Sequence, residues 1–271
     1  MIYQSGVYIV DSVTIPAGET WEAAEGARVI FTCFDGSPPT VTISAGATAR
    51  GLWFGGTRQT TQGSALFCKA DAIADNCTFY GYYEGFAVGE GERNQIINCA
   101  FVNVGYGLYY HPIYVSNPHS AGDGILIDNN IFVGCEGYSV HLWNDFLGGT
   151  HYNTVTRNFI GAAKYGIVSR GHDNVVRDNV IWSTSATHSY LADGANLRWK
   201  HNLYGSDCFN RVLLEQDADA IVKFNGFVSP LPAFGAAPKI YANSGFLGFS
   251  KASINNSITR LVAAFTQTAQ A

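Results

Sequence analysis

The chain has 271 residues, of which 47% are hydrophobic and only 14% are charged, and its formal net charge is −5. This composition predicts a folded protein, and the excess of acidic over basic residues argues against a basic surface that would bind nucleic acid. The sequence has no apolar run of the roughly 20 residues needed to cross a bilayer. Its first residues, "MIYQSGVYIV", lack the features of a signal peptide.

Six cysteines are scattered along the sequence without any Cys-x-x-Cys pair. Because their spacing is not clustered, they predict neither a zinc site nor a small disulfide scaffold, and we interpret them as buried, mostly free thiols. They are Cys33, Cys68, Cys77, Cys99, Cys135 and Cys208.

From residue 74 onward, a short segment recurs in which apolar residues flank one corner residue. Examples are "ADNCTF", "DNNIF", "RDNVI" and "KFNGF". The corner residues follow one another at spacings of 22, 31, 28, 21, 23 and 23, so a base period of 21 to 23 contains two enlarged members. They are Cys77, Cys99, Asn130, Asn158, Asn179, Asn202 and Asn225.

A repeat this short cannot bury its own apolar face, so successive repeats must stack into one continuous core. The apolar residues alternate with period 2 and are punctuated by Gly, Asn, Asp and Ser, which predicts parallel strands stacked about 4.8 Å apart in a solenoid. An inward asparagine at the same corner of every turn could then hydrogen-bond its copies above and below. The alternative is that these are ordinary asparagines of surface turns.

A second strand in each repeat aligns as well, and alternation places its side chains inside and outside in turn. Ile113, Val140, Ile167 and Tyr190 align as inward positions. Three outward columns follow: Ala87, Tyr114, His141, Val168, Leu191 and Leu213; Gly89, Ser116, Trp143, Arg170, Asp193 and Glu215; and Glu84, His111, Tyr138, Tyr165, His188 and Asn210.

Near the middle of the solenoid these columns predict the floor of a groove, formed by Tyr114, His141, Trp143 and Arg170. Insertions at 106–111, 116–123 and 144–151 lie beside the same strand and would wall it. Aromatic faces stack on sugar rings, and His, Arg and Asn bind hydroxyls or carboxylates, so we predict a polysaccharide partner. The predicted substrate-binding residues are Trp143, His111, Tyr138, Tyr165, His119 and Asn144. Scattered surface aromatics or a subunit interface remain the alternative.

Cleavage of a uronic-acid polymer by β-elimination is the reaction that best suits these residues. It needs a cation to neutralise the carboxylate, a base and an acid. Arg170, with Lys164, could neutralise the substrate carboxylate, while His141 and Tyr114 could serve as base and acid. An Arg-x-Pro-x-x-Arg pattern and a close Asp cluster for calcium are both missing from the sequence. We therefore expect no cofactor; calcium, which no motif indicates, is the alternative.

Hydrolysis is the alternative reaction, and it needs two carboxylates flanking the bond. Asp193 and Glu215 share a column on adjacent turns, and Asp123 and Asp145 form a second possible pair in the insertions. A non-catalytic structural or carbohydrate-binding protein is the third possibility. The cluster "SRGHDN" (169–174) is typical of a turn, and the acids of "EQDADA" (215–220) are typical of a solvated turn.

The C-terminal part, residues 229–271, departs from the repeat. It begins with three prolines in "SPLPAFGAAP", and from Asn256, a plausible N-cap, apolar residues recur with helical spacing at Ile258, Leu261, Val262 and Phe265, with Ile254 just before. We predict a solenoid over 1–228 and a cap, possibly helical, or an oligomerisation segment over 229–271. Leu191, Leu213 and this helix could pack a homotrimer.

The segments "HPIYVSN", "DGILIDNNIF", "NTVTRNFI" and "YGIVSRGHDNVVRDNVIW" resemble repeats of the right-handed parallel β-helix proteins of the pectate-lyase-like superfamily, over roughly residues 40–228. The opening "VTIPAGETWEAAEGARVIF" resembles the first turns of such proteins, phage tailspikes included. The resemblance implies an all-β, single-stranded right-handed β-helix of about 22 residues per turn. It also implies an extracellular or virion-associated location. It says little about the reaction, because this fold hosts many activities.

Overall fold

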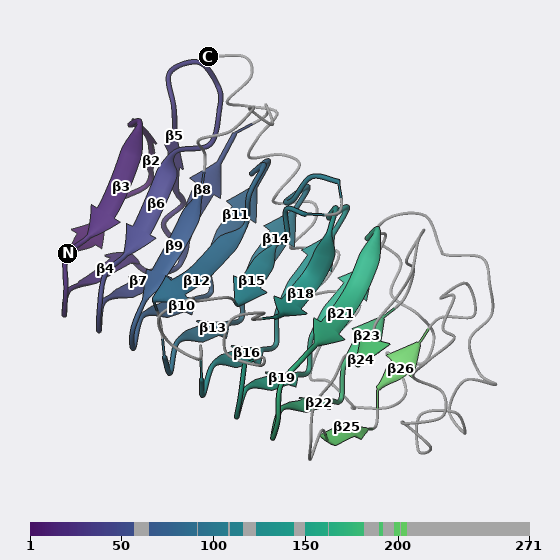
Figure 1. Cartoon of the computed structure of the whole chain (residues 1–271). Coiled ribbons are helices and arrows are strands. Elements are labelled where there is room, and N and C mark those ends of the chain that lie inside the picture. Colours follow the sequence, from purple (N-terminus) through teal and green to yellow (C-terminus); the bar gives the residue numbers. More distant parts are fainter. Residues whose placement is uncertain are drawn as a thin grey trace.

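The structure is a computed structural model that describes residues 1–56, 65–90, 92–107, 109–115, 123–143, 150–161, 163–181, 190–191, 198–200 and 202–204. Within these ranges the regular structure consists of strands β1 to β26, all of which pair in parallel into three sheets. Consecutive strands enter the three sheets in turn, so the chain winds into a solenoid whose sheets run along its length (Figure 1). The described part contains no helix that could cross a bilayer.

The three sheets are named A, B and C in this article. Sheet A contains β1 (Ile2–Tyr3), β4 (Thr20–Ala23), β7 (Thr48–Arg50), β10 (Ile73–Asp75), β13 (Gln95–Ile97), β16 (Leu126–Asp128), β19 (Thr154–Thr156), β22 (Val175–Arg177) and β25 (Arg198–Lys200). Sheet B contains β2 (Gly6–Ile9), β5 (Val29–Thr32), β8 (Leu52–Gly55), β11 (Thr78–Tyr80), β14 (Ala100–Val102), β17 (Ile131–Val133), β20 (Phe159–Gly161), β23 (Val180–Ile181) and β26 (Leu203–Tyr204). Sheet C contains β3 (Ser12–Ile15), β6 (Thr40–Ile43), β9 (Leu66–Lys69), β12 (Phe86–Glu90), β15 (Ile113–Val115), β18 (Tyr138–Leu142), β21 (Tyr165–Ser169) and β24 (Tyr190–Leu191).

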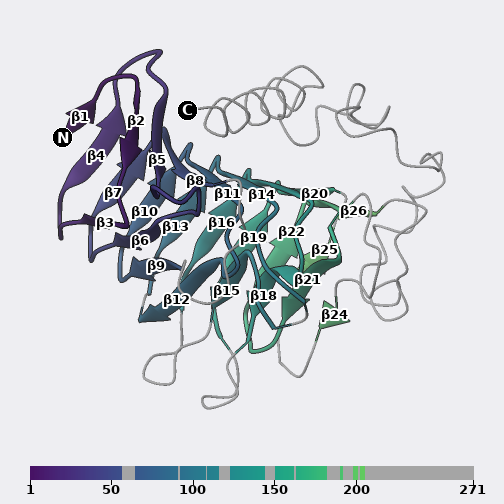
Figure 2. The same cartoon turned by 90° about the horizontal axis from the view of Figure 1, so that it is seen from above.

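The length of one turn follows from the strand register. Ile2 pairs with Glu22, 20 residues later, and Gln95 pairs with Leu126, 31 residues later. The predicted all-β parallel solenoid is therefore confirmed, together with the enlarged turns in its middle. Figure 2 shows the same stack from above, with the N-terminal strands at one end. The boundary predicted at residue 228 and the whole of 229–271 lie outside the described residues.

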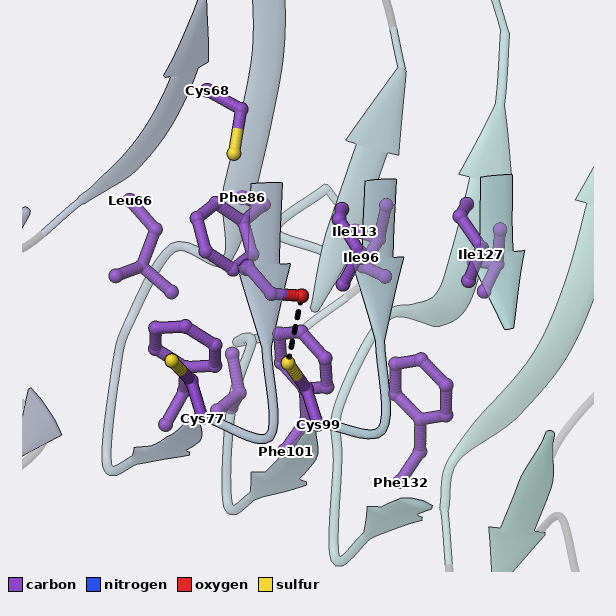
Figure 3. Packing of buried hydrophobic residues seen from close by; sticks show 14 of the residues in the cluster. Leu66, Cys68, Cys77, Phe86, Ile96, Cys99, Phe101, Ile113, Ile127 and Phe132 are labelled. Carbon is purple, nitrogen blue, oxygen red and sulfur yellow. Dashed lines mark hydrogen bonds between the residues drawn. The ribbon is translucent and has the colours of Figure 1, made fainter. Parts of the chain in front are cut away.

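The core is a column of aromatic rings contributed by successive strands of sheet B. Phe31, Phe54, Phe79, Phe101 and Phe132 pair in register, and each ring stacks on the next with centroids 5.4, 5.6, 5.1 and 4.9 Å apart. Aliphatic side chains from sheets A and C pack against this column inside the solenoid (Figure 3). Burying one such phenylalanine contributes roughly 1.5–3 kcal/mol. The turns are thus held together by repeated contacts between neighbours.

The predicted asparagine ladder lies between sheets A and B. Asn130, Asn158, Asn179 and Asn202 are fully buried, which excludes ordinary surface turns. Each of the first three donates both its backbone N–H and its side-chain amide to the Oδ1 of the next, at 2.9–3.0 Å. Every buried polar group at this corner therefore has a partner from the adjacent turn. Asn225, the last predicted member, lies outside the described residues.

Two cysteines continue the same column, as the sequence predicted. Cys77 and Cys99 are buried free thiols, and their Sγ atoms donate to the backbone carbonyls of Ala49 and Ala74, each at 3.4 Å; Figure 3 shows the bond from Cys99. The other cysteines in the described ranges are also free, while Cys208 lies outside those ranges. The prediction of buried, unpaired thiols is thus confirmed for this part of the chain, although Cys33 is only partly buried.

A second asparagine ladder, not predicted from the sequence, lies between sheets C and A. Asn94, Asn153 and Asn174 are buried there. Asn94 Oδ1 accepts the backbone N–H of Ala72 at 2.8 Å, Asn153 Oδ1 accepts that of Ile125 at 2.9 Å, and Asn174 Oδ1 accepts that of Asn153 at 3.0 Å. Ile125 stands at the corner between Asn94 and Asn153, so this ladder is interrupted and only Asn153 and Asn174 bond directly to each other.

Candidate functional site

The outer face of sheet C carries the predicted groove floor. Ile113, Val140 and Ile167 pair in register and are fully buried, which confirms the inward positions predicted on β15, β18 and β21. Tyr114 and His141, one position later, form the adjacent pair and point out of the core. The sequence therefore placed the floor on the correct face of these three strands.

The four predicted floor residues contact one another in succession. The rings of Tyr114 and His141 are stacked with centroids 5.0 Å apart, and the His141 and Trp143 centroids lie 5.5 Å apart. The guanidinium of Arg170 then lies over the Trp143 ring, 5.0 Å from its centroid. All four side chains are half-buried. An aromatic strip that ends in a cation thus crosses three turns of the solenoid.

His111 and Tyr138 were predicted to point outward, and this is wrong, because both side chains are buried. His111 precedes β15 and so escapes strand alternation; its ring lies 4.1 Å from that of His141, and its Nδ1 accepts the backbone N–H of Tyr138 at 2.8 Å. The segment of Tyr110 and His111 can pack this closely against residue 137 because that residue is glycine: a Cβ there would lie 2.2 Å from the carbonyl oxygen of Tyr110. His111 therefore supports the floor from below.

Both histidines of the cluster are neutral in the folded protein. Burial lowers the pKa of His111 to about 4, and burial together with the neighbouring His111 lowers the pKa of His141 to about 2. The Nδ1 of His141 is buried and has no hydrogen-bond partner among the described residues. An acid–base histidine is ordinarily oriented and made more basic by a carboxylate or carbonyl on its second nitrogen. Within the described part of the chain, no carboxylate or carbonyl gives His141 that support.

Lys164 and Arg170 were predicted to act together on one substrate carboxylate, but they lie at opposite ends of β21. Six residues of extended chain separate them, about 20 Å. The Nζ of Lys164 lies 3.9 Å from Glu136 and 5.9 Å from the centroid of Tyr165, whereas Arg170 lies on Trp143. The joint role is therefore corrected, and Arg170 is the cation of the floor. Tyr165, half-buried, contacts the Tyr138 ring with centroids 5.0 Å apart.

The register predicted at the next turn is also wrong. Val168 pairs with Tyr190 and Ser169 with Leu191, whereas the sequence alignment had placed Tyr190 beside Ile167 and Leu191 beside Val168. The two-residue strand β24 is too short for apolar alternation to fix its register. Val168, predicted on the surface, is fully buried. Leu191 thus pairs with Ser169 and not with Val168, and Leu213 lies outside the described residues.

Of the four carboxylates proposed for hydrolysis, only Asp123 lies within the described residues. Asp193, Glu215 and Asp145 fall outside the described residues, as do the predicted substrate-binding residues His119 and Asn144. Asp123 is described, and its Oδ1 accepts the backbone N–H of His151 at 2.9 Å, so it holds a corner of the chain. Among the described residues, no three His, Cys, Asp or Glu side chains gather as a metal site.

The "SRGHDN" cluster forms a turn, as predicted, but it also stacks two imidazoles. The rings of His151 and His172 are nearly parallel, with centroids 3.6 Å apart, and His151 Nδ1 accepts the backbone N–H of His172 at 3.0 Å. His172 Nδ1 lies 2.9 Å from Asp173 Oδ2. This corner follows the end of β21 and therefore borders the floor next to Arg170.

A tyrosine cluster on the opposite border of sheet C was not predicted as a site. The ring of Tyr83 lies 4.8 Å from that of Tyr106 and 4.5 Å from that of Tyr110, between centroids. Tyr106 is 50% exposed and the neighbouring Tyr109 is 80% exposed. The signal was the tyrosine-rich insertion at 106–111, which the sequence analysis treated only as a wall. The aromatic surface of this face is therefore wider than the predicted floor.

A family model described as "Right handed beta helix region" matches residues 62–227. No curated protein and no solved structure matches the chain.

Proposed function

The chain belongs to the right-handed β-helix family, and on this scaffold we propose that the outer face of sheet C binds an acidic polysaccharide outside the cell or on a virion. One observation carries the proposal: Tyr114, His141, Trp143 and Arg170 form an unbroken series of contacts across three turns. A polymer repeats its chemistry along its length, and so does a solenoid face. The fold is compatible with proteins that bind polysaccharides and with proteins that cleave them.

The chemistry of the strip favours a carbohydrate that carries carboxylates. Aromatic rings offer flat apolar surfaces to sugar rings, and neutral imidazoles offer hydrogen bonds to hydroxyls without bringing a charge. Arg170 supplies the single cation of the strip and can pair with a uronate carboxylate in a forked geometry. We therefore assign sugar stacking to Trp143 and carboxylate recognition to Arg170.

Cleavage by β-elimination is the second candidate. His141 is unprotonated throughout the neutral range, so it is in the form that accepts a proton, and its ring stacks on the phenol of Tyr114, which could return one. A pKa of about 2 makes it a weak base in the free protein. A bound uronate carboxylate would raise that pKa, because a nearby anion stabilises the imidazolium. Binding is therefore the primary proposal, and catalysis depends on the substrate.

The test is a panel of neutral and uronic-acid polysaccharides, assayed for binding by calorimetry and for cleavage by absorbance near 235 nm together with reducing ends. Trp143→Ala should weaken binding to all bound polymers about tenfold, the loss of one stacked ring. Phe34→Ala, an 89% exposed aromatic at the N-terminal end of the solenoid, is the matched control and should change nothing.

Arg170→Ala should weaken binding to uronate polymers far more than binding to neutral ones, while Arg177→Ala, on the exposed outer face of sheet A, should not discriminate. Equal effects of Trp143→Ala and Phe34→Ala, or binding to no member of the panel, would refute the proposal. Unsaturated ends that vanish in His141→Ala would add the lyase activity. Reducing ends without absorbance would instead favour hydrolysis.

A further inference from the structure

The corner between sheets C and A, where β21 ends and β22 begins, contains a histidine with a carboxylate partner. The Nδ1 of His172 lies 2.9 Å from Asp173 Oδ2. An ionised carboxylate only accepts hydrogen bonds, so Nδ1 carries the proton, and in the neutral imidazole Nε2 then holds a lone pair. No hydrogen bond within the described ranges uses that Nε2, and the side chain is 43% exposed. His172 therefore presents a proton-accepting nitrogen to solvent.

The backbone around His172 is held by the preceding turn of the solenoid. The carbonyl of Arg170 accepts the backbone N–H of Thr150 at 3.0 Å. The backbone N–H of His172 donates to His151 Nδ1, also at 3.0 Å. Between them, Gly171 packs so closely that a Cβ on it would lie 2.0 Å from the carbonyl oxygen of Thr150. Contacts with the neighbouring turn thus fix the position of His172 relative to Arg170.

The preceding turn also places a ring against each of the two groups. The Arg170 guanidinium lies 5.0 Å from the centroid of Trp143, and the imidazole of His172 stacks on that of His151 with centroids 3.6 Å apart. Only one residue separates Arg170 from His172, so their Cα atoms are at most about 7 Å apart. In a uronate the carboxylate is bonded to C5. A cation on the carboxylate and a base at the C5 proton must therefore lie within about one sugar ring of each other, which this spacing allows.

A phenol lies beside the same imidazole. The ring of Tyr152 contacts that of His172 edge to face, with centroids 5.5 Å apart, and Tyr152 is 59% exposed. Its backbone N–H donates to the His172 carbonyl at 3.3 Å, as that of Gly124 does to His151 one turn earlier. Both residues have a left-handed φ, +58° at Tyr152 and +70° at Gly124, which suits glycine better than a bulky side chain. Such strain tends to occur at functional sites. The corner thus combines a proton donor with the proton acceptor.

We propose that His172 is the base of a β-elimination on a uronic-acid polymer whose carboxylate is bound by Arg170. This inference rests on the proposed function, because it needs the polymer to lie on the outer face of sheet C. His172 Nε2 takes the proton from C5, and the electron pair of that C–H bond forms the double bond between C4 and C5. Arg170 stabilises the negative charge that spreads onto the carboxylate as this proton leaves.

The bond between C4 and the glycosidic oxygen breaks in the same reaction. The leaving oxygen keeps the electron pair of that bond and takes a proton from the Tyr152 hydroxyl. The proton on His172 then returns to Tyr152 through solvent, which restores both groups. Asp173 does not touch the polymer; it is a positioning residue that holds the Nδ1 proton and directs Nε2 outward. The base is thus His172 and not His141, whose Nδ1 has no such partner in the described ranges.

The test measures cleavage and binding separately on the full chain. Alginate, polygalacturonate and hyaluronan are the uronic-acid probes; kcat and KM come from the absorbance of unsaturated ends, and Kd comes from calorimetry. The variants are His172→Ala, with and without added imidazole, Asp173→Asn and Tyr152→Phe. Asp178→Asn is the matched control, because Asp173 and Asp178 flank β22 and both have a left-handed φ, +58° and +56°.

His172→Ala should lower kcat about 100-fold or more, with Kd changed by less than about twofold, and imidazole should restore part of kcat. Asp173→Asn and Tyr152→Phe should each lower kcat about tenfold or more with KM unchanged. Asp178→Asn should match the wild type.

Wild-type cleavage by His172→Ala, or a loss that imidazole does not restore, would overturn the assignment, as would cleavage that is lost only in His141→Ala. Polymers that bind without yielding unsaturated ends would overturn it too, while leaving the proposed binding intact. Binding to no polymer would refute both proposals. If His172→Ala does not fold, Asp173→Asn decides: a wild-type kcat refutes the assignment.

Discussion

Asn158 is the residue at which the ladder between sheets A and B can be tested most directly. Its Oδ1 accepts from the backbone N–H and the side-chain amide of Asn130, at 2.9 and 3.0 Å, and its Nδ2 donates to the carbonyl of Ile127 at 3.0 Å. In Asn158→Ala the side-chain amide of Asn130 keeps the carbonyl of Ile96 as a partner at 2.8 Å, whereas the Asn130 backbone N–H and the Ile127 carbonyl lose Asn158. Each of these two groups costs about 1–3 kcal/mol when unsatisfied, so we expect a loss of about 2–6 kcal/mol. That is a large part of the free energy of unfolding of a typical protein, about 5–15 kcal/mol.

The assay is urea unfolding of the full chain followed by circular dichroism, with amide exchange in β16, on the N-terminal side of residue 158, and in β22, on its C-terminal side, as the local readout. Thr154→Ala, on the outward face of the neighbouring strand β19, is the control and should cost less than about 0.5 kcal/mol. Asn179 Oδ1 keeps the backbone N–H of Asn158 as a donor in the variant, so the damage should be largest on the N-terminal side of residue 158. A loss below about 1 kcal/mol, or faster exchange on both sides alike, would refute the argument.

Three further predictions concern the cluster beneath sheet C and the core. The pKa values of His111, about 4, and His141, about 2, lie below the ordinary value of 6.5, so below pH 6.5 the unfolded chain binds more protons than the folded protein. The free energy of unfolding should therefore fall as the pH is lowered from about 7 to about 5.5. His111→Gln should make this dependence of stability on pH weaker. Gly137→Ala should cost more than about 2 kcal/mol in urea unfolding, because φ is +66° and a Cβ would lie 2.2 Å from the Tyr110 carbonyl oxygen; a neutral result would contradict the described contact. Burial raises the pKa of the Cys135 thiol to about 12, so it should react with thiol reagents only after unfolding, and labelling of the native protein would contradict this.

The fold could be predicted because the corner residues and the apolar period repeat in register. The same sequences also contained the second ladder: Asn153 precedes Asn158 by five residues, and Asn174 precedes Asn179 by the same interval. One strand of sheet A fills that interval, so both ends of the strand carry an inward asparagine. The repeats were aligned only at the corner between sheets A and B, so the recurring asparagine at the corner between sheets C and A was not predicted.

The candidate site was predicted only as far as strand alternation applies. Tyr114 and His141 lie within strands, where the alternation of side chains decides which face they occupy, and both were placed correctly. His111 lies in a connection, where backbone direction depends on contacts with the next turn, and it was misplaced. The register of Leu191 failed because β24 is two residues long. The pKa values of the histidines depend on burial, which alternation alone does not give.

The two ladders advance in step at the same turn. Asn153 and Asn174 are 21 residues apart, and so are Asn158 and Asn179. Residues 154–174 are consequently a complete module: without them, Asn153 would be followed by Val175, and every remaining strand would meet a neighbour of the same sheet. The protein can thus lengthen or shorten by whole turns of about 4.8 Å without redesigning its corners. Removing residues 154–174 would shorten the sheet C strip by the rung that carries Arg170, and repeating them would lengthen it by one rung, so that the same scaffold could match a different polymer.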